Sequence, residues 1–242
     1  MNTEEQKKAA ATAAVEWLDS RLHADTIVGV GTGSTADHFI DLLALHRARF
    51  AGAVSSSTRS AERLARHGIR VFDLNDVVEL PMYVDGADEI TAQLEMTKGG
   101  GGALTREKIV AAASRIFVCI ADASKRVEKL GAFPLPVEVI PMARAQVVRA
   151  LGTLGRERAL GEDAMRASIR LRSAADGTPY ITDNGNCIVD VSGWTIADPR
   201  AVEAGIGAIV GVVESGLFAL RGADVLFLAR PEGVESHHWS AT

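Results

Sequence analysis

The amino-acid sequence predicts an α/β fold in which helices cover both faces of a mostly parallel sheet, together with a smaller α+β domain. In the first half of the chain, short apolar runs alternate with stretches of helical periodicity, which is typical of parallel strands joined by right-handed crossovers. Aromatic residues make up only 5% of the 242 residues. The core is therefore mostly aliphatic, which suits parallel strands covered by helices better than an aromatic-rich β-sandwich.

The composition excludes several classes of protein. Hydrophobic residues are 47% and charged residues 24% of the chain, which rules out wholesale disorder. The net charge of −5 at pH 7 lacks the basic surplus of a nucleic-acid-binding protein. No apolar run approaches the ~20 residues that span a bilayer, so we expect no membrane contact. Cys119 and Cys187 lie in apolar runs and are expected to be buried free thiols of a cytoplasmic protein.

The elements of the larger domain follow from local patterns. Strands are expected at residues 27–30, 53–54, 69–72, 82–84, 116–120 and 223–228. The N-terminal segment is predicted to be a helix, with Thr3 as N-cap and Gln6 completing a capping box. A helix from Ser34 is indicated by one apolar face, formed by Ala36, Phe39, Ile40 and Leu43. Gly68 is expected to end a third helix, and a fourth is expected over residues 105–113.

The middle of the chain has a different pattern. A strand at residues 137–140 precedes a helix that begins after Pro141, and residues 169–171 and 180–181 flank an Asp176-Gly177 turn, which predicts a hairpin. Asp198 followed by Pro199 is a helix start, as N-cap and first helical residue. We therefore expect a Rossmann-like domain of residues 1–129 and 207–242 and a ferredoxin-like α+β domain of residues 130–206, with His237 and His238 in a frayed tail.

Four polar motifs each follow directly on a predicted strand of the first domain. They are Gly31-Thr32-Gly33-Ser34-Thr35, Ser55-Ser56-Ser57, Asp85-Gly86-Ala87-Asp88-Glu89 and Asp122-Ala123-Ser124-Lys125. The carboxyl ends of parallel strands open on one edge of a sheet, and ligands bind there. The sequence therefore predicts a ligand site at this edge.

The first motif is a glycine-rich turn that leads into a helix N-terminus, an arrangement that favours phosphate. Gly33 is followed by Ser34 without the lysine of a nucleotide P-loop, and the third glycine of a dinucleotide fingerprint is missing. The hydroxyls indicate a small phosphate ester. The alternative is a tight turn in which Ser34 or Thr35 caps the helix.

The carboxylates Asp85, Asp88 and Glu89 have three interpretations. Clustered carboxylates suit a magnesium ion, and neighbouring carboxylates also suit general acid–base chemistry. The third interpretation is a polar loop with Asp88 or Glu89 on the surface. Asp85 fits that loop least, because it directly follows Tyr83 and Val84 at a strand end.

Lys98 precedes four consecutive glycines, residues 99–102, and then a helix that carries Glu107 in its first turn. Ordering four glycines is costly, and a chain usually accepts that cost where N–H groups approach a ligand, which here indicates an oxyanion site. Glu107 is either a base above that site or, as is commoner for a first-turn acid, a complement to the helix dipole. Lys125 is either a phosphate counter-ion or an ordinary surface lysine.

Together these residues closely resemble the ribose-5-phosphate isomerase A family. The resemblance covers nearly the whole chain, in the family's order, and rests on residues 29–35, 54–57, 83–90, 98–109, 120–125, 133–141, 182–186 and 221–224. Three stretches depart from the family pattern: residues 58–60, a longer segment at 156–168, and the tail after Gly233. None of them touches a motif residue.

The resemblance implies interconversion of ribose 5-phosphate and ribulose 5-phosphate in the pentose phosphate pathway, without a metal or other cofactor. Glu107 matches the proton acceptor, and Lys98 with the N–H groups of Gly99, Gly100 and Gly101 would stabilise the enediolate. Asp85 and Asp88, with Gly86 and Ala87, would contact the sugar. The phosphate would be held by Thr32, Gly33, Ser34, Thr35 and Lys125, with Lys7 or Lys8 as further candidates.

The resemblance also implies a homodimer or homotetramer, formed through the small domain. A sugar-phosphate sensor of related architecture is the alternative from another class, because fold does not determine function. A sensor would keep the phosphate loop and dispense with the base, whereas this chain has Glu107 and Lys98 together. Isomerisation of a different aldose phosphate would use the same motifs with another pocket shape.

Overall fold

The computed structural model describes residues 1–158, 160 and 168–239. Within them the chain divides into two compact units. Unit 1 contains residues 1–87, 106–126 and 223–242, and unit 2 contains residues 88–105 and 127–222. The domain boundaries expected from the sequence, 1–129 with 207–242 and 130–206, remain a prediction.

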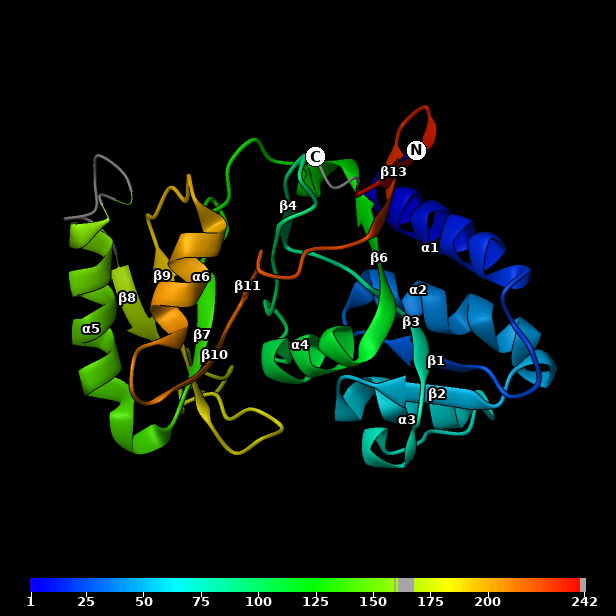
Figure 1. The fold of residues 1–242 in the computed structure, drawn as a ribbon, viewed down its shortest axis with the longest axis horizontal. Coiled ribbons are helices and arrows are strands. Elements are labelled where there is room, and N and C mark those ends of the chain that lie inside the picture. The colour runs from blue at the N-terminus through cyan, green and yellow to red at the C-terminus, as the bar shows by residue number, and fades with distance from the viewer. Residues whose placement is uncertain (159, 161–167, 240–242) are drawn as a thin grey trace. The chain divides into compact units, whose positions relative to one another are not determined.

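Unit 1 is built on a six-stranded sheet, ordered β13-β12-β6-β3-β1-β2 (Figure 1). Its strands are β1 (Ile27–Val30), β2 (Gly52–Ser55), β3 (Leu80–Asp85), β6 (Ser114–Asp122), β12 (Val225–Arg230) and β13 (Gly233–His238). All neighbours are parallel except β12 and β13, which are antiparallel. The order of the strands reverses at β1 and β3, and such a switch point is where open α/β sheets bind ligands.

The helices of this region are α1 (Thr3–Asp19), α2 (Ser34–Leu43), α3 (Thr58–Arg66) and α4 (Leu104–Ala113), with 3₁₀ turns η1 (Ala44–Arg49), η2 (Leu74–Asp76) and η3 (Ala123–Lys125). The apolar face predicted for α2 is buried as expected, at Ala36, Phe39, Ile40 and Leu43. It shares one aliphatic core with α1 and the sheet residues Val28, Val84 and Ile120. This packing holds the first turn of α2 at the end of β1.

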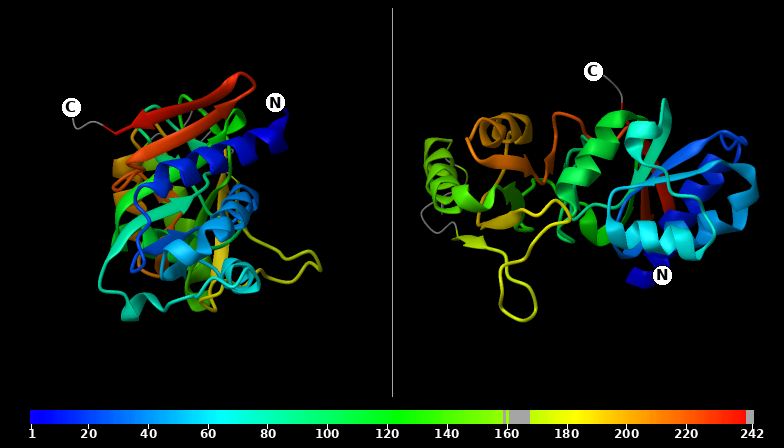
Figure 2. Two further views of the ribbon diagram at one scale, coloured as in Figure 1. Left: turned by 90° about the vertical axis from the view of Figure 1, so that its right-hand side faces the viewer. Right: turned by 90° about the horizontal axis from the view of Figure 1, so that it is seen from below.

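Unit 2 contains a four-stranded antiparallel sheet, ordered β10-β7-β9-β8 (Figure 2). The strands are β7 (Leu135–Val139), β8 (Ser168–Leu171), β9 (Cys187–Ser192) and β10 (Val212–Ser215). With η4 (Pro141–Ala143), α5 (Arg144–Glu157) and α6 (Pro199–Gly207), the chain order is β-α-β-β-α-β, which is the ferredoxin-like arrangement. A second, three-stranded sheet joins β4 (Glu89–Ile90), β5 (Met96–Thr97) and β11 (Leu217–Phe218). The fold class predicted from the sequence is confirmed.

Two local predictions in unit 1 are wrong. Residues 69–72 form no strand of the described sheet, since only the bridge between Ala53 and Val71 joins them to β2. The chain leaves this edge at once because Asp73 caps η2. The N-cap of α1 is Asn2, whose capping box is completed by Glu5. The same box pattern occurs one residue earlier than expected, with a carboxylate as the stronger acceptor.

Two further corrections concern strand pairing. The partner of β8 is β9, where Ile169 faces Val191 and Leu171 faces Val189, rather than residues 180–181. Apolar cross-strand pairs decide the partner of residues 169–171. The predicted turn at Asp176-Gly177 is nevertheless present, because Ser173 and Pro179 form an antiparallel bridge and the Ala174 N–H donates to the Thr178 carbonyl. The tail residues His237 and His238 belong to β13 rather than to a frayed end, because they pair with β12.

The predictions for the two cysteines and for the start of α6 are confirmed. Cys119 and Cys187 are buried free cysteines. Asp198 caps α6 with Pro199 as its first residue. Among the described residues, no helix has the length and apolar character needed to cross a membrane. The longer segment at 156–168 falls largely outside the described residues.

Candidate active site

The polar loops after β1, β3 and β6 lie on three neighbouring strands of unit 1 (Figure 1). Adjacent strands are about 4.8 Å apart, so the carboxyl ends of the three strands form one short edge. A Cβ atom added at Gly86 would lie 3.8 Å from Thr35 Cβ and 3.7 Å from the Ile120 carbonyl oxygen. The loops that were predicted to share an edge are therefore in contact within this unit.

Asp85 is fully buried at the end of β3 and accepts hydrogen bonds from three donors. Its carboxylate receives the Thr32 N–H at 3.1 Å, the Gly86 N–H at 2.7 Å and the Tyr83 hydroxyl at 2.5 Å. A Cβ atom at Gly31 would lie 1.9 Å from this carboxylate, so only glycine fits at Gly31. The interpretation of Asp85 as part of a polar surface loop is thus incorrect.

Tyr83 is a polar partner that the sequence analysis missed. Its side chain is fully buried, and burial, followed by the negative charges of Asp85 and Glu107, raises its pKa well above the ordinary value. The phenol therefore stays protonated and donates to Asp85. The signal in the sequence was the presence of a tyrosine in a buried strand, since a buried hydroxyl requires a hydrogen-bond partner.

The first turn of α2 presents backbone N–H groups at this edge. Its N-cap is Gly33, which has a φ of 103° and no side-chain hydrogen bond, so neither Ser34 nor Thr35 caps the helix. A helix start without a side-chain cap leaves its first N–H groups available to an anion. Ser34 is exposed at this end.

The Thr32 hydroxyl is held by a small network of serines. It accepts hydrogen bonds from Ser57 Oγ at 3.0 Å and from Ser60 Oγ at 3.1 Å. Ser57 also caps α3 by accepting from the Ser60 N–H. Ser60 was not predicted as part of the site, because it lies in the segment that departs from the family pattern. These two serines therefore hold the loop of residues 31–35 in place and are not themselves assigned to phosphate binding.

Lys125 ends the η3 turn that follows β6. It is half-buried, and within the described residues its amino group has no hydrogen bond or ion pair. The turn is fixed by Asp122, which accepts from the Ser124 N–H, and by Gln6, which accepts from the Ala123 N–H. Lys7, in contrast, forms an ion pair with Glu4 at 2.5 Å. Lys125 is thus the better candidate cation for a phosphate.

Glu107 lies in the first turn of α4 and is only 2% exposed. Within unit 1 its negative charge acts on Tyr83, which also carries the hydrogen bond to Asp85. An acid that merely complements a helix dipole normally remains in solvent. Burial of Glu107 therefore favours its interpretation as a base over its interpretation as a complement to the helix dipole.

Unit 2 contains the predicted lysine–glycine loop. Lys98 is 3% exposed, its N–H donates to the Gly216 carbonyl, and its amino group lies 5.5 Å from the centre of the Phe218 ring. The Gly100 N–H donates to Asp88 Oδ2 at 2.7 Å, and the Gly102 N–H donates to the Gly99 carbonyl at 2.9 Å. Among the predicted donors in the described chain, Gly99 and Gly101 keep N–H groups without a protein acceptor.

The sequence matches the family described as ribose 5-phosphate isomerase A (phosphoriboisomerase A) over residues 52–233. The chain belongs to this family. It is therefore a member of a family of aldose–ketose isomerases, and its polar edge in unit 1 and glycine loop in unit 2 are the segments that carried the resemblance.

Solved structures agree with this assignment. Ribose 5-phosphate isomerase A from Neisseria gonorrhoeae is 44% identical, with a TM-score of 0.86 and coverage of 99% of each chain. The enzyme from Methanocaldococcus jannaschii is 34% identical, with a TM-score of 0.86 and coverage of 97% of this chain and 99% of its own. A D-ribose-5-phosphate isomerase solved with phospho-erythronic acid is 35% identical, with a TM-score of 0.84 and coverage of 98% and 100%.

Glu89, one of the three clustered carboxylates, is occupied by backbone N–H groups of unit 2. Glu89 is buried in unit 2 and accepts the N–H groups of Gly131 at 2.9 Å and Phe133 at 2.8 Å. In the part of the chain that the structure describes, no group of three His, Cys, Asp or Glu side chains could hold a metal ion. Glu89 instead anchors the loop before β7.

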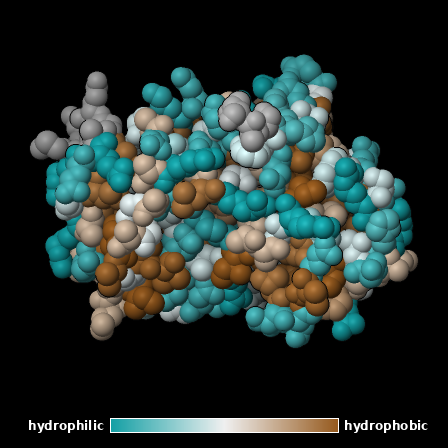
Figure 3. Space-filling model, viewed as in Figure 1, coloured by the Kyte–Doolittle hydropathy of each residue, from teal (hydrophilic) through white to brown (hydrophobic). Residues whose placement is uncertain are grey.

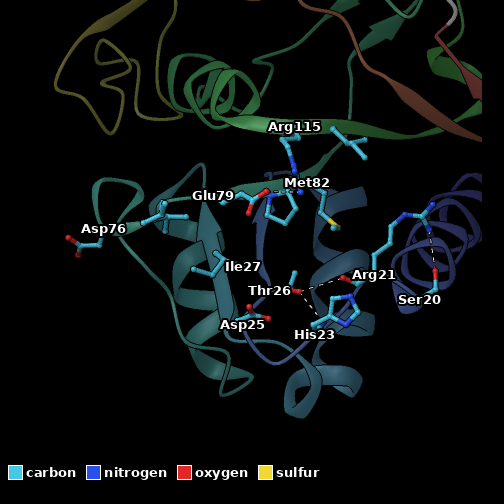
Figure 4. Close-up of a pocket in the computed structure, with 14 residues that line it drawn as sticks. Ser20, Arg21, His23, Asp25, Thr26, Ile27, Asp76, Glu79, Met82 and Arg115 are labelled. Atoms are coloured by element: carbon cyan, nitrogen blue, oxygen red, sulfur yellow. Dashed lines mark hydrogen bonds and ion pairs between the residues drawn. The ribbon is translucent and has the colours of Figure 1, made fainter.

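A pocket of about 850 Å³ in unit 1 is not the predicted site (Figure 4). It lies beside the amino ends of β1, β3 and β6, lined by Ile27, Met82 and Ile116, whereas the polar motifs follow the carboxyl ends. At its rim Arg115 pairs with Glu79 at 2.6 Å. Apolar residues gather at the lower right of the surface in Figure 3, where β1 to β3 lie in Figure 1. The pocket is therefore on the wrong edge of the sheet for the family's chemistry.

Proposed function

We propose that this chain interconverts D-ribose 5-phosphate and D-ribulose 5-phosphate by moving a proton between C2 and C1 through an enediolate. Family membership supports this reaction. The observation that carries it furthest is the burial of Glu107, which is 2% exposed in the first turn of α4. A buried carboxylate in a substrate-binding region is suited to act as a general base.

In the proposed reaction, Glu107 takes the proton from C2 of the open-chain aldose and returns it to C1. The C2 hydroxyl gives up its proton and becomes a carbonyl, while the C1 carbonyl oxygen gains a proton and becomes a hydroxyl, so protons, oxidation and reduction balance within one substrate and no cofactor is needed. Negative charge develops on oxygen in the enediolate. Lys98 and the N–H groups of the glycine loop neutralise that charge.

The remaining residues bind the substrate. Asp85 and Asp88, with Gly86 and Ala87, bind the sugar and its hydroxyl groups. Asp85 also assists opening of the sugar ring. The first turn of α2, residues 32–35, and Lys125 bind the phosphate. One relative was solved with phospho-erythronic acid, which carries a phosphate at one end and a carboxylate at the other, and the proposed substrate likewise presents a phosphate and, as the enediolate, a second negative charge.

We also propose that the enzyme works in the cytoplasm, on the non-oxidative branch of the pentose phosphate pathway, as a homodimer or homotetramer. A small sugar phosphate is its ligand, and neither nucleic acid nor a membrane is a partner. The net charge of −5 is consistent with that restriction.

The decisive experiment compares wild type with Glu107→Gln, which keeps the shape and removes the base. We expect ribose 5-phosphate turnover that survives EDTA in the wild type and falls by about 10²–10⁴-fold in the variant. Isothermal titration should show that the variant still binds ribose 5-phosphate.

Glu128→Gln makes the same chemical change at an exposed position and should leave turnover unchanged. Binding of ribose 5-phosphate without turnover by the wild type would instead identify a sugar-phosphate sensor. Loss of activity in EDTA would assign the carboxylates to a metal.

A further inference from the structure

Arg172, in the segment that follows β8, grips the glycine loop through its carbonyl oxygens. Its Nη1 atom donates to the Gly99 carbonyl at 3.0 Å and to the Gly100 carbonyl at 3.1 Å. The other side of the guanidinium donates to Asp190 from Nε at 2.8 Å and from Nη2 at 2.5 Å. A two-point pair with a carboxylate on β9 fixes the plane of the guanidinium.

The backbone of Arg172 is fixed as firmly as its side chain. Its N–H donates to the Ile188 carbonyl at 2.8 Å, and its carbonyl accepts the Tyr180 N–H at 2.9 Å. The side chains of Arg172 and Asp190 are 15% and 24% exposed. The Arg172 group that donates to the glycine loop is therefore held by hydrogen bonds on both its side chain and its backbone, and it is largely buried.

Tyr180 adds a second contact from the same segment. Its hydroxyl donates to the Gly101 carbonyl at 3.2 Å. A Cβ atom at Gly102 would lie 2.3 Å from this hydroxyl, so the loop and the tyrosine pack in direct contact. The carbonyls of Gly99, Gly100 and Gly101 are thus all held from one side.

Because the peptide group is planar, fixing a carbonyl also fixes the direction of the N–H group in the same peptide. In a trans peptide the C=O and N–H bonds point in opposite directions. The plane that joins Gly100 to Gly101 has its carbonyl held by Arg172, so the Gly101 N–H points away from the Arg172 side. The Gly100 and Gly102 N–H groups are already used by Asp88 and by the Gly99 carbonyl. Gly101 is the donor that the contact with Arg172 leaves available and orients.

We propose that Arg172, oriented by Asp190, is a positioning residue that directs the Gly101 N–H toward the oxyanion formed during isomerisation. This inference rests on the proposed function, because it needs an oxyanion to stabilise. Arg172 does not touch the substrate. It acts by holding the two peptide planes on either side of Gly100, whose orientations would otherwise vary in a run of glycines.

The test is steady-state kinetics of Arg172→Lys and Arg172→Ala with ribose 5-phosphate. Lysine keeps the charge but cannot contact Asp190 in a fork while it spans two carbonyls. We expect kcat to fall by about 10- to 100-fold with KM changed less than 3-fold, a smaller loss than the ~10²–10³-fold that follows removal of an oxyanion donor. Inhibition by phospho-erythronic acid should weaken in parallel with kcat/KM, and added guanidinium ion should partly restore Arg172→Ala.

Two further variants separate positioning from simple loss of structure. Asp190→Asn should lower kcat in the same way. The double variant Arg172→Lys/Asp190→Asn should have a kcat no lower than that of the less active single variant, because both residues act through one contact. Arg156→Lys, at an exposed position of α5, should retain wild-type kinetics.

An unchanged kcat in Arg172→Ala, or a loss explained entirely by the unfolded fraction in circular dichroism, would overturn the inference while leaving the proposed function intact. A wild type without turnover would overturn the proposed function itself. The two failures are therefore distinguishable.

Discussion

The carboxylate of Asp85 shows how single residues set up this site. Its donors include two backbone N–H groups and one phenol, and the phenol belongs to one of the two tyrosines in the chain. Burial raises the pKa of Tyr83, and burial also raises that of Tyr180 against the opposing charge of Arg172. Both phenols therefore remain hydrogen-bond donors well into the alkaline range.

The raised pKa values of the two tyrosines predict how the stability of the protein changes at alkaline pH. A folded-state pKa above the unfolded value, about 10 for tyrosine, gives stability that is complete below pH 10 and is lost as pH rises through the folded pKa. Ultraviolet difference titration should therefore show little phenolate near pH 10 in the folded protein, and Tyr83 should ionise only as it unfolds. Tyr83→Phe should leave the Tyr180 titration in place and reduce the alkaline loss of stability. A full phenolate signal at pH 10 from folded wild type would contradict this.

At the scale of elements, Glu138 joins three segments of unit 2. This fully buried carboxylate on β7 accepts the Thr105 hydroxyl at 2.5 Å and the Thr182 hydroxyl at 2.9 Å. It also accepts the side-chain amides of Asn184 at 3.1 Å and Asn186 at 2.8 Å. The contact with Thr105 secures the first turn of α4, two residues before Glu107.

Glu138→Gln should therefore destabilise the protein more than a surface change does. The amide replaces one acceptor oxygen with a donor, and each buried donor left unsatisfied costs about 1–3 kcal/mol. We expect Tm to fall by about 2–4 °C for each kcal/mol in a chain of this length. Differential scanning fluorimetry measures the shift, and Glu128→Gln at an exposed position is the control. Equal Tm values for the two variants would contradict this role.

At the scale of the whole molecule, the family resemblance predicts self-association through the small domain. Unit 2 carries a groove of about 500 Å³ lined by Pro141, Met142, Ala145, Val148, Leu171 and Val189 among others. Met142 is 96% exposed and Ile140 is 45% exposed. Apolar side chains this exposed beside a groove are suited to contact a second copy of the chain.

Sedimentation equilibrium should therefore give a mass of twice the 25.6 kDa of the chain, or a further doubling for a tetramer. Met142→Glu should shift the wild-type assembly toward the monomer, because it places a charge in an apolar contact. Val78→Glu, at an exposed apolar position of unit 1, should leave the mass unchanged. A monomeric wild type would remove the predicted dimer and tetramer together.

Much of the fold could be predicted from local pattern. The buried face of α2, the cap of α6 and the alternation of strands and helices follow from residue spacing and capping chemistry. Strand pairing was harder to predict from the sequence, because residues 169–171 pair with β9 and not with residues 180–181 across the nearer turn. Pairing depends on which apolar faces meet, and sequence distance does not reveal that.

The family, the polar motifs and the types of group that the chemistry needs can be read from the residues alone, because glycines, carboxylates and lysines carry those properties wherever they lie. Which of these groups are already engaged becomes visible in the folded chain. The tertiary structure assigned Glu89 to a backbone anchor, the Gly100 N–H to Asp88, and Tyr83 to Asp85. Hydrogen bonds depend on distances of a few ångströms between residues far apart along the chain, and those distances exist only in the folded protein.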